Sequence, residues 1–312
     1  MRGAHRRCER VIPACVLVTG AEGFIGSRLS SYLERRGSRV IRGVRRQARG
    51  SEGTVELELP TQDLGPILER FGPDLVVHAA GTSSVQRSFE QTAADFRSNV
   101  ASTQSLLAAL AASESKPRLM FLSSAAVYGT PLRMPIKETQ PVAPISPYGV
   151  HKAAAELLCR YYARVHGVPT LRLRIFSAYG PGLKRQILWD VCQKWQRSGE
   201  IVLSGTGCET RDLLHVSDVV SALALAADRA PFDGRAINVA SGTAVTMAHL
   251  AGMLIAQLGA GHLRFTHKAR RGDPSHWQAS IERLSRLGFK QTVGLEEGVQ
   301  EYVAWVRREQ FE

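Results

Sequence analysis

Apolar residues in the first half of the chain fall into short runs separated by longer stretches of helical periodicity. The runs are rich in β-branched residues and predict strands. They span residues 15–19, 39–43, 54–57, 74–78, 117–122 and 169–175. The stretches between them predict helices at 24–36, 61–71, 89–113 and 146–166. Strands that alternate with helices form βαβ units, so the pattern predicts an α/β protein with a doubly wound parallel sheet.

The pattern becomes less regular after residue 176. Short strands are predicted near 201–204 and 211–216, and helices at 183–198, 217–229, 245–258 and 295–308. We interpret 13–176, with 213–240 returning to it, as the sheet domain, and 177–212 with 241–312 as a smaller C-terminal lobe. Residues 1–12 are basic and predict a flexible tail. Open α/β sheets bind ligands at the carboxyl ends of their strands, where we expect the smaller lobe to lie.

A glycine-rich turn follows the first predicted strand. Gly20, Gly23 and Gly26 are spaced three residues apart between that strand and the next helix. The first glycine permits the turn, the second lets the backbone approach a pyrophosphate, and the third lets helix and strand pack closely. The first N–H groups of the helix, at Phe24 and Ile25, would face the phosphates. An ordinary turn is the alternative, but strand, glycines and helix together predict a Rossmann-type dinucleotide site.

The chain has 312 residues and a formal net charge of +12. Its arginines are spread along the whole sequence, whereas a nucleic-acid-binding protein tends to gather basic residues on one element with aromatic partners. We therefore expect no nucleic-acid partner. Most of the arginines are interpreted as solvated surface, and a few as contacts for an anionic substrate.

The five cysteines show neither a CxxC pair nor metal-ligand spacing with histidine. We therefore expect reduced thiols, no metal site and a cytoplasmic location. No long apolar stretch follows the basic N-terminus, so no secretory signal is predicted. No apolar run reaches the length of a membrane span, so no membrane association is expected.

Tyr148 and Lys152 lie four residues apart at the start of the predicted helix that follows Pro147. Residues at this spacing share one helix face, and an ammonium beside a phenol lowers the pKa of the phenol. Such a tyrosine can exchange a proton with an alcohol or ketone near neutral pH. Ser124, at the end of a predicted strand, could hydrogen-bond the same oxygen. A surface pair is the alternative, but the glycine turn and Ser124 favour a catalytic interpretation.

Further motifs follow the glycine turn in a fixed order. With TGAEGFIG at 19–26 they are HAAG at 78–81, Asn99-Val100, SSAAVYG at 123–129, YGVHK at 148–152, YGPG at 179–182, RDLLHVSD at 211–218 and RRGD at 270–273. On these motifs the chain resembles the extended short-chain dehydrogenase/reductases, in particular the NAD(P)-dependent nucleotide-sugar epimerase/dehydratase family that includes UDP-glucose 4-epimerases. The resemblance implies a Rossmann-type sheet, a smaller C-terminal substrate-binding lobe and a nucleoside-diphosphate sugar as substrate.

The resemblance also implies roles for single residues. Tyr148 is the catalytic acid/base, Lys152 holds the nicotinamide ribose and lowers the pKa of Tyr148, and Ser124 hydrogen-bonds the reacting oxygen. The implied cofactor contacts are Gly20, Gly23, Phe24, Ile25, Gly26, Arg45, Arg46, Glu58, Leu59, Ala79, Ala80, Gly81, Asn99, Tyr148 and Lys152. The implied substrate contacts are Ser83, Ser84, Ser124, Ser177, Arg211 and Arg270. The last two are expected at the diphosphate, because a guanidinium pairs with two oxygens at once.

Three places depart from the family pattern. Ala125 and Ala126 stand where family dehydratases carry an Asp-Glu pair, so 4,6-dehydration is not expected. Ser177 stands where many UDP-sugar members carry asparagine, which leaves the nucleotide open. After the second strand, Arg45 and Arg46 replace the acidic residue that binds the ribose of NAD, and an arginine accommodates a 2′-phosphate. NADP(H) is therefore favoured over NAD(H), unless these arginines only begin a solvated loop.

These observations predict hydride transfer at a hexose carbon, expected to be C4, of a nucleoside-diphosphate sugar. A 4-ketoreductase is slightly favoured, and a 4-epimerase that retains NAD is the alternative. A non-catalytic dinucleotide sensor would have no use for Ser124, Tyr148 and Lys152. A ketone substrate without a nucleotide would leave the two arginines of the diphosphate site without a partner. The helices around 89–113 and 148–166 match those that pair between subunits in relatives, so a homodimer is expected.

Overall fold

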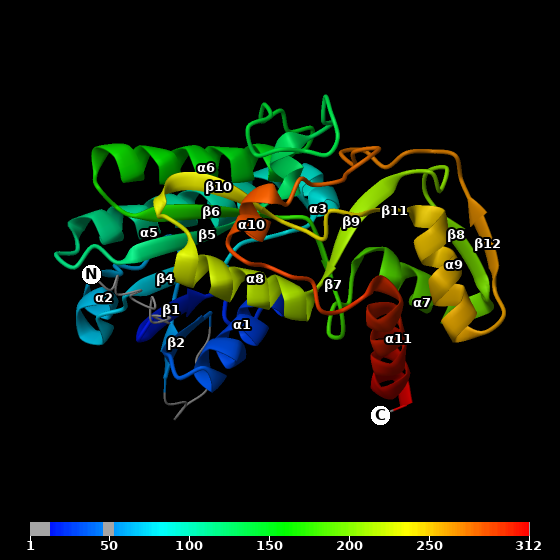
Figure 1. The fold of residues 1–312 in the computed structure, drawn as a ribbon, viewed down its shortest axis with the longest axis horizontal. Coiled ribbons are helices and arrows are strands. Elements are labelled where there is room, and N and C mark those ends of the chain that lie inside the picture. The colour runs from blue at the N-terminus through cyan, green and yellow to red at the C-terminus, as the bar shows by residue number, and fades with distance from the viewer. Residues whose placement is uncertain (1–12, 46–52, 312) are drawn as a thin grey trace, which may run out of the picture.

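The computed structural model describes residues 13–45 and 53–311. Within these residues, seven parallel strands form the central sheet in the order β10-β6-β5-β4-β1-β2-β3 (Figure 1). The strands are β1 (Cys15–Thr19), β2 (Arg39–Val44), β3 (Thr54–Glu56), β4 (Leu75–His78), β5 (Arg118–Ser124), β6 (Thr170–Ile175) and β10 (Asp233–Val239). The strand order β3-β2-β1-β4-β5-β6, with β10 added at the edge, confirms the predicted Rossmann-type α/β fold.

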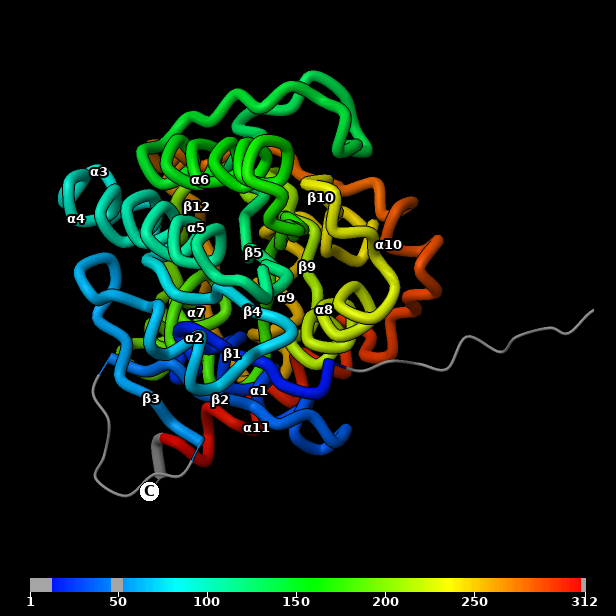
Figure 2. Tube along the Cα trace, turned by 90° about the vertical axis from the view of Figure 1, so that its left-hand side faces the viewer, coloured from blue at the N-terminus to red at the C-terminus, as the bar shows by residue number. Residues whose placement is uncertain are grey.

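Helices cover both faces of this sheet, as the end-on view shows (Figure 2). They are α1 (Phe24–Arg35) and α8 (Val216–Arg229) on one face, and α2 (Gly65–Phe71), α5 (Ser102–Ala112) and α6 (Pro147–Val165) on the other. Val16 and Val18 belong to the hydrophobic cluster of the first face, and Leu17 to that of the second. Successive side chains of a strand point to opposite faces. Burial on both faces explains why the strands read as nearly continuous apolar runs.

The segment predicted as a single helix at 89–113 is divided in the structure. It consists of α3 (Val85–Glu90), α4 (Thr92–Phe96), a π-helical turn (Arg97–Ala101) and α5. Ser84 caps α3, and Gln91 leaves the helical conformation with φ −128°. The hydroxyl of Thr92 donates to the carbonyl of Ser88 at 2.8 Å. Side-chain hydroxyls that bond to nearby backbone compete with regular helix, so the polar residues here explain the division.

A smaller lobe lies beyond the end of the sheet, on the right of Figure 1. Its elements are β7 (Ser177–Tyr179), α7 (Gln186–Ser198), β8 (Glu200–Leu203), β9 (Thr210–His215), β11 (Ala244–Thr246), α9 (Met247–Leu258), β12 (His262–Phe265) and α11 (Leu295–Phe311). They enclose a hydrophobic cluster of their own, with Leu188, Leu250 and Tyr302 buried in it. The smaller C-terminal lobe is therefore present, while the domain boundaries given above stay a prediction.

Four strands and one helix were not predicted from the sequence pattern: β7, β10, β11, β12 and α10 (Glu282–Arg286). In β10, polar residues at Asp233, Arg235 and Asn238 interrupt the apolar run. The first two are exposed and pair with each other, whereas Asn238 is fully buried and donates to the carbonyl of Ile136 at 2.9 Å. A buried polar group that is satisfied by a distant residue cannot be recognised from periodicity alone.

Two expectations concern parts of the chain outside these elements. The predicted flexible tail at 1–12 lies outside the described residues, as does Arg46. In the part of the chain that the structure covers, no helix combines the length and the apolar character needed to cross a bilayer.

Candidate active site

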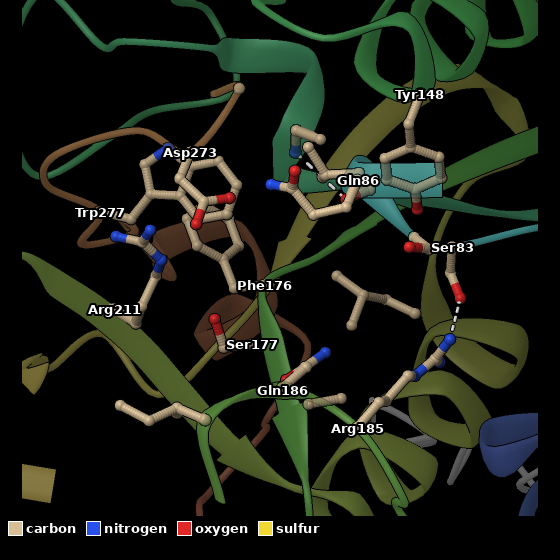
Figure 3. Close-up of a pocket in the computed structure, with 18 of the residues that line it drawn as sticks. Ser83, Gln86, Tyr148, Phe176, Ser177, Arg185, Gln186, Arg211, Asp273 and Trp277 are labelled. Carbon is tan, nitrogen blue, oxygen red and sulfur yellow. Dashed lines mark hydrogen bonds between the residues drawn. The ribbon is translucent and has the colours of Figure 1, made fainter. Parts of the chain in front are cut away.

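A cavity of about 900 Å³ lies between the carboxyl ends of the sheet strands and the smaller lobe (Figure 3). The predicted site residues that line it from the sheet domain are Gly23, Phe24, Ile25, Gly26, Ala79, Ala80, Gly81, Ser83, Ser84, Ser124, Tyr148 and Lys152. Those from the smaller lobe are Ser177, Arg211 and Arg270. One cavity therefore brings together most of the residues singled out in the sequence, and its volume lies in the range of small-molecule sites.

Some predicted cofactor contacts do not line this cavity: Gly20, Arg45, Glu58, Leu59 and Asn99. Arg45 and Glu58 are exposed, and Leu59 packs against the hydrophobic cluster beneath α2 and α5. Gly20 and Asn99 lie behind the cavity wall, where they contact the lining residues Ala80 and Gly81.

The glycine turn has the geometry that a dinucleotide requires. Gly20 has φ +70°, and a Cβ on it would lie 2.7 Å from the backbone nitrogen of Ala80. A Cβ on Gly26 would overlap the carbonyl oxygen of Gly20. The N-cap of α1 is Gly23, which has no side chain to cap the first N–H groups of the helix. These donors border the cavity with the positive end of the helix dipole, so the turn fits a pyrophosphate.

Tyr148 is held at the first turn of α6. Ser146 caps the helix by accepting from the N–H of Gly149 at 3.1 Å, and the N–H of Tyr148 donates to Ser88 at 3.1 Å. The phenol points into the cavity (Figure 3). Burial raises the pKa of Tyr148, while a hydrogen bond with Ser124 opposes the rise. The two residues therefore present their hydroxyls to the same point of the cavity.

Lys152 lies one turn further along α6 and is buried. Its ammonium donates to the carbonyl of Leu122 at 2.9 Å and lies 4.8 Å from the centre of the Phe121 ring. Burial lowers the pKa of Lys152 to about 8. In this structure the groups that oppose the rise in the pKa of Tyr148 are Ser124 and Arg185, and a lowering of that pKa by Lys152 stays a prediction.

The loop after β4 forms the floor of the cavity. Gly81 has φ +138°, and a Cβ on it would lie 2.6 Å from the Oδ1 atom of Asn99. The side-chain amide of Asn99 donates to the hydroxyl of Thr82 at 2.9 Å. His78, at the end of β4, is fully buried and hydrogen-bonded to Thr19 at 2.8 Å, and burial lowers its pKa to about 3. We therefore assign His78 a structural role.

Two arginines of the smaller lobe border the far end of the cavity. The guanidinium of Arg211 lies 5.5 Å from the ring centre of Trp277, which also lines the cavity. Burial lowers the pKa of Arg211, and the charge of Asp273 opposes this. Arg270 forms an ion pair with Asp190 at 3.3 Å. Both arginines line the part of the cavity that the smaller lobe forms, whereas Ser124, Tyr148 and Lys152 line it from the sheet domain.

Arg185 is a cavity residue that the sequence analysis missed. It occupies the N-cap position of α7 in an extended conformation (φ −165°, ψ 178°) without a capping hydrogen bond, and its guanidinium donates to the hydroxyl of Ser83 (Figure 3). Burial lowers the pKa of Arg185, and the charge of Tyr148 opposes this, so guanidinium and phenol face the same space. The signal in the sequence is a cation at the start of a helix, where the helix dipole disfavours positive charge.

No group of three or more histidine, cysteine or acidic side chains that could hold a metal ion occurs in residues 13–45 and 53–311. The described cavity brings Ser124, Tyr148 and Lys152 together beside a turn that fits a dinucleotide.

Comparisons with known proteins agree with this arrangement. The model of the NAD dependent epimerase/dehydratase family matches residues 16–240. The UDP-glucose 4-epimerase of Mycolicibacterium smegmatis is 28% identical, over 93% of this chain and 98% of its own length. The dTDP-glucose 4,6-dehydratase of Streptomyces niveus is 31% identical, over 94% and 92%.

Among solved structures, MoeE5 in complex with UDP-glucuronic acid and NAD is 33% identical, with a TM-score of 0.84. The match covers 94% of this chain and 99% of that one. The fold, the glycine turn and the Ser-Tyr-Lys group thus occur together in a chain that the family model matches over most of its length. The protein belongs to the NAD dependent epimerase/dehydratase family.

Proposed function

We propose that this protein is an NAD-dependent 4-epimerase of a UDP-linked hexuronic acid. The observation that carries the proposal is the position of Arg185. Its guanidinium faces the same space as the phenol of Tyr148, and its hydrogen-bond partner is the neutral hydroxyl of Ser83. The arginines at the other end of the cavity have Asp273 and Asp190 beside them. Arg185 is therefore the cation best placed to take an anionic group of the substrate.

The geometry of a hexuronic acid matches this arrangement. Its carboxylate is attached to C5, next to the C4 hydroxyl that exchanges a proton with Tyr148. A group that binds the carboxylate must therefore lie within a few ångströms of the phenol. A guanidinium can donate two parallel hydrogen bonds to a carboxylate. Arg185 has the chemistry and the place for this contact.

The choice of NAD rests on relatives and on the exposed position of Arg45. MoeE5, at 33% identity, was solved with UDP-glucuronic acid and NAD. Arg45 is exposed at the end of β2 and does not line the cavity. The preference for NADP(H) predicted from Arg45 and Arg46 thus finds no support in the relatives. The glycine turn and the uncapped first turn of α1 would hold the pyrophosphate.

The mechanism follows from the side chains at the cavity floor. Tyr148 takes the proton of the C4 hydroxyl, and Ser124 hydrogen-bonds the same oxygen. The glycine turn would hold NAD, which when bound would supply the acceptor and donor of the C4 hydride. After the 4-ketosugar has turned its other face, Tyr148 returns the proton to the C4 oxygen, so no net proton or hydride is consumed. The charge of Lys152 favours the deprotonated form of the phenol when the two groups approach.

Dehydration is not favoured by the residues after β5. Ala125 and Ala126 occupy the 3₁₀ turn (Ala125–Tyr128) that follows the catalytic serine, and both are buried. Elimination of water requires a base for a ring proton and an acid for the departing hydroxyl. Two methyl groups supply neither, although a dTDP-glucose 4,6-dehydratase is among the relatives.

A 4-ketoreductase is the second candidate. The observation that favours it is that β2 runs into Arg45, without the carboxylate that binds the ribose hydroxyls of NAD. The two functions differ in the fate of the cofactor, because an epimerase regenerates its NAD in each turnover.

We further propose that the enzyme is a homodimer formed through α6. Its exposed side includes Val150, Leu157, Tyr161 and Val165, which are between 46% and 62% exposed. Their spacing places them along one face of the helix. Leu157→Glu is expected to convert the dimer to a monomer in analytical ultracentrifugation.

The proposed function is tested by incubating the purified protein with UDP-glucuronic acid or UDP-glucose and following C4 configuration by NMR. We expect UDP-galacturonic acid to form without added or released NADH, and much less conversion of UDP-glucose. Net consumption of added NADPH with a 4-keto substrate would favour the ketoreductase.

A further inference from the structure

A buried carboxylate lies beside the catalytic pair without lining the cavity. Asp95, on α4, is 3% exposed. Its Oδ2 atom pairs with the Nδ1 atom of His151 at 2.6 Å, and its Oδ1 atom accepts from the hydroxyl of Thr82. His151 forms an ion pair with Asp95 only when its imidazole is protonated, and is otherwise a hydrogen-bond partner. No lysine or arginine of the described chain is within ion-pair distance to neutralise this carboxylate.

The contact with Thr82 connects Asp95 to the cavity wall. Thr82 lines the cavity in the loop that follows β4. The side-chain amide of Asn99 donates both to the hydroxyl of Thr82 and to the backbone carbonyl of Asp95, at 2.9 and 3.2 Å. Asp95 and Asn99 therefore fix the hydroxyl of Thr82 from behind the wall.

The contact with His151 connects Asp95 to the catalytic helix. His151 lies directly before Lys152 on α6 and is buried. The ring of Phe96 meets its imidazole edge-on, with the ring centres 5.5 Å apart and the planes at 82°. The pair thus joins α4 to the first turns of α6, where Tyr148 also lies.

The charge of Asp95 acts on both members of the catalytic pair. Burial lowers the pKa of Lys152, and the charge of Asp95 is the strongest influence that raises it again. The other groups that act on Lys152 are Glu156 and Cys159 on its own helix, and it in turn acts on His78 of β4.

The charge of Asp95 also raises the pKa of Tyr148. The remaining charged or polar groups that face the phenol are Ser124 at the end of β5 and Arg185 before α7, and both lower its pKa. Asp95 is thus the acidic group that acts on phenol and ammonium together.

We propose that Asp95 is a positioning residue which, held by His151 and Thr82, fixes the first turns of α6 against the loop after β4 and places a buried carboxylate behind Tyr148 and Lys152. Asp95 touches neither substrate nor cofactor and acts through these two residues. The proposal rests on the acid–base roles given to them under the proposed function, and is independent of which sugar is bound.

The first test is the pH profile of kcat for Asp95→Asn, which removes the charge and keeps the size. Loss of a negative charge lowers the pKa of an ammonium and of a phenol alike. We therefore expect both the acidic and the basic limb of the profile to move to lower pH. Glu90→Gln removes the same charge from an exposed site on α3 and is expected to leave the profile unchanged.

His151→Gln separates charge from positioning. It retains the carboxylate of Asp95 and removes its imidazole partner. We therefore expect a lower kcat, while the acidic and basic limbs of the pH profile stay at the same pH as in the wild type. A profile of Asp95→Asn that matches the wild type after scaling by one factor would overturn the proposal, since a purely structural defect lowers the rate equally at each pH.

The second test needs no sugar. The absorbance of tyrosinate is titrated in the dinucleotide-bound protein, and the contribution of Tyr148 is obtained by subtracting the Tyr148→Phe variant. We expect this titration to move to lower pH in Asp95→Asn and in Asp95→Ser, the smaller variant that serves if the first does not fold. An unmoved titration overturns the proposal, whereas a wild type that turns over no uronic acid overturns only the proposed function.

Discussion

The carboxylate of Glu156 accepts three hydrogen bonds from the guanidinium of Arg174, at 2.7, 2.9 and 3.2 Å, behind the catalytic end of the sheet. Both residues are at most 3% exposed. Glu156 lies one turn after Lys152 on α6, and it also accepts from the hydroxyl of Ser123 at 2.7 Å. These contacts tie the helix of Tyr148 and Lys152 to β6, which carries Arg174, and to β5, which carries Ser123 and Ser124.

Glu156→Gln is expected to lower the free energy of unfolding by about 3–5 kcal/mol, since it leaves a buried guanidinium without its counter-charge. Urea unfolding of the variant and the wild type measures this difference. The matched control is Glu282→Gln, which removes the exposed partner of Arg286 on α10 and is expected to cost less than about 0.5 kcal/mol. Equal costs for the two variants would show that the buried pair adds no stability.

The same pair predicts a pH dependence. Although burial raises the pKa of Glu156, the hydrogen bonds and charges of Arg174 and Arg172 outweigh it and hold that pKa below its ordinary value. A carboxyl group with a lowered folded-state pKa stabilises the fold above its unfolded pKa, about 4.3 for glutamate, and loses this contribution as pH falls further. The difference between wild type and Glu156→Gln should therefore be constant near neutrality and shrink in acid.

Tyr148→Phe is expected to reduce kcat by roughly 10²–10⁴-fold, because general acid–base catalysis contributes about that factor. The fold and the bound dinucleotide should persist, since only a hydroxyl is removed. Tyr161→Phe removes a hydroxyl from the exposed side of the same helix and should retain full activity. A Tyr148→Phe variant as active as this control would exclude the phenol as the acid/base.

Gly26→Ala is expected to lose dinucleotide binding, because its Cβ would overlap the carbonyl oxygen of Gly20 in the turn. Gly252→Ala is the control, since a Cβ there meets nothing within 4 Å on α9. In a helix interior this change should stabilise the protein by about 0.5–1 kcal/mol. Isothermal titration with NAD and thermal melting separate the two effects. Normal NAD affinity in Gly26→Ala would contradict the close packing of the turn.

The parts of the site that the sequence predicted lie on continuous elements with fixed spacing. Gly20, Gly23 and Gly26 follow a strand, and Tyr148 and Lys152 share a helix face, so local periodicity was enough to place them. The pattern likewise predicted six strands of the central sheet. The split of the helix at 89–113 was missed because it depends on side-chain hydroxyls that bond to the backbone.

Other features depend on contacts between distant parts of the chain. Arg185 reaches Ser83, and Asp95 reaches His151, across separations that no spacing rule covers. The upward shift in the pKa of Tyr148 is also a consequence of tertiary burial. Such relationships become visible only when the smaller lobe and the helices around the sheet are in place.

The measurement that tests the central claim most directly is the ratio of kcat/KM for UDP-glucuronic acid to that for UDP-glucose, in the wild type and in Arg185→Gln. A charged hydrogen bond contributes about 1.5–3 kcal/mol, so the variant should lose roughly tenfold to a hundredfold on the uronic acid. Its activity on UDP-glucose should change little. Lys184→Gln, which removes the neighbouring cation that pairs with Glu309, should retain the wild-type ratio. An unchanged ratio in Arg185→Gln, or a wild type that prefers UDP-glucose, would contradict the assignment of a uronic acid substrate.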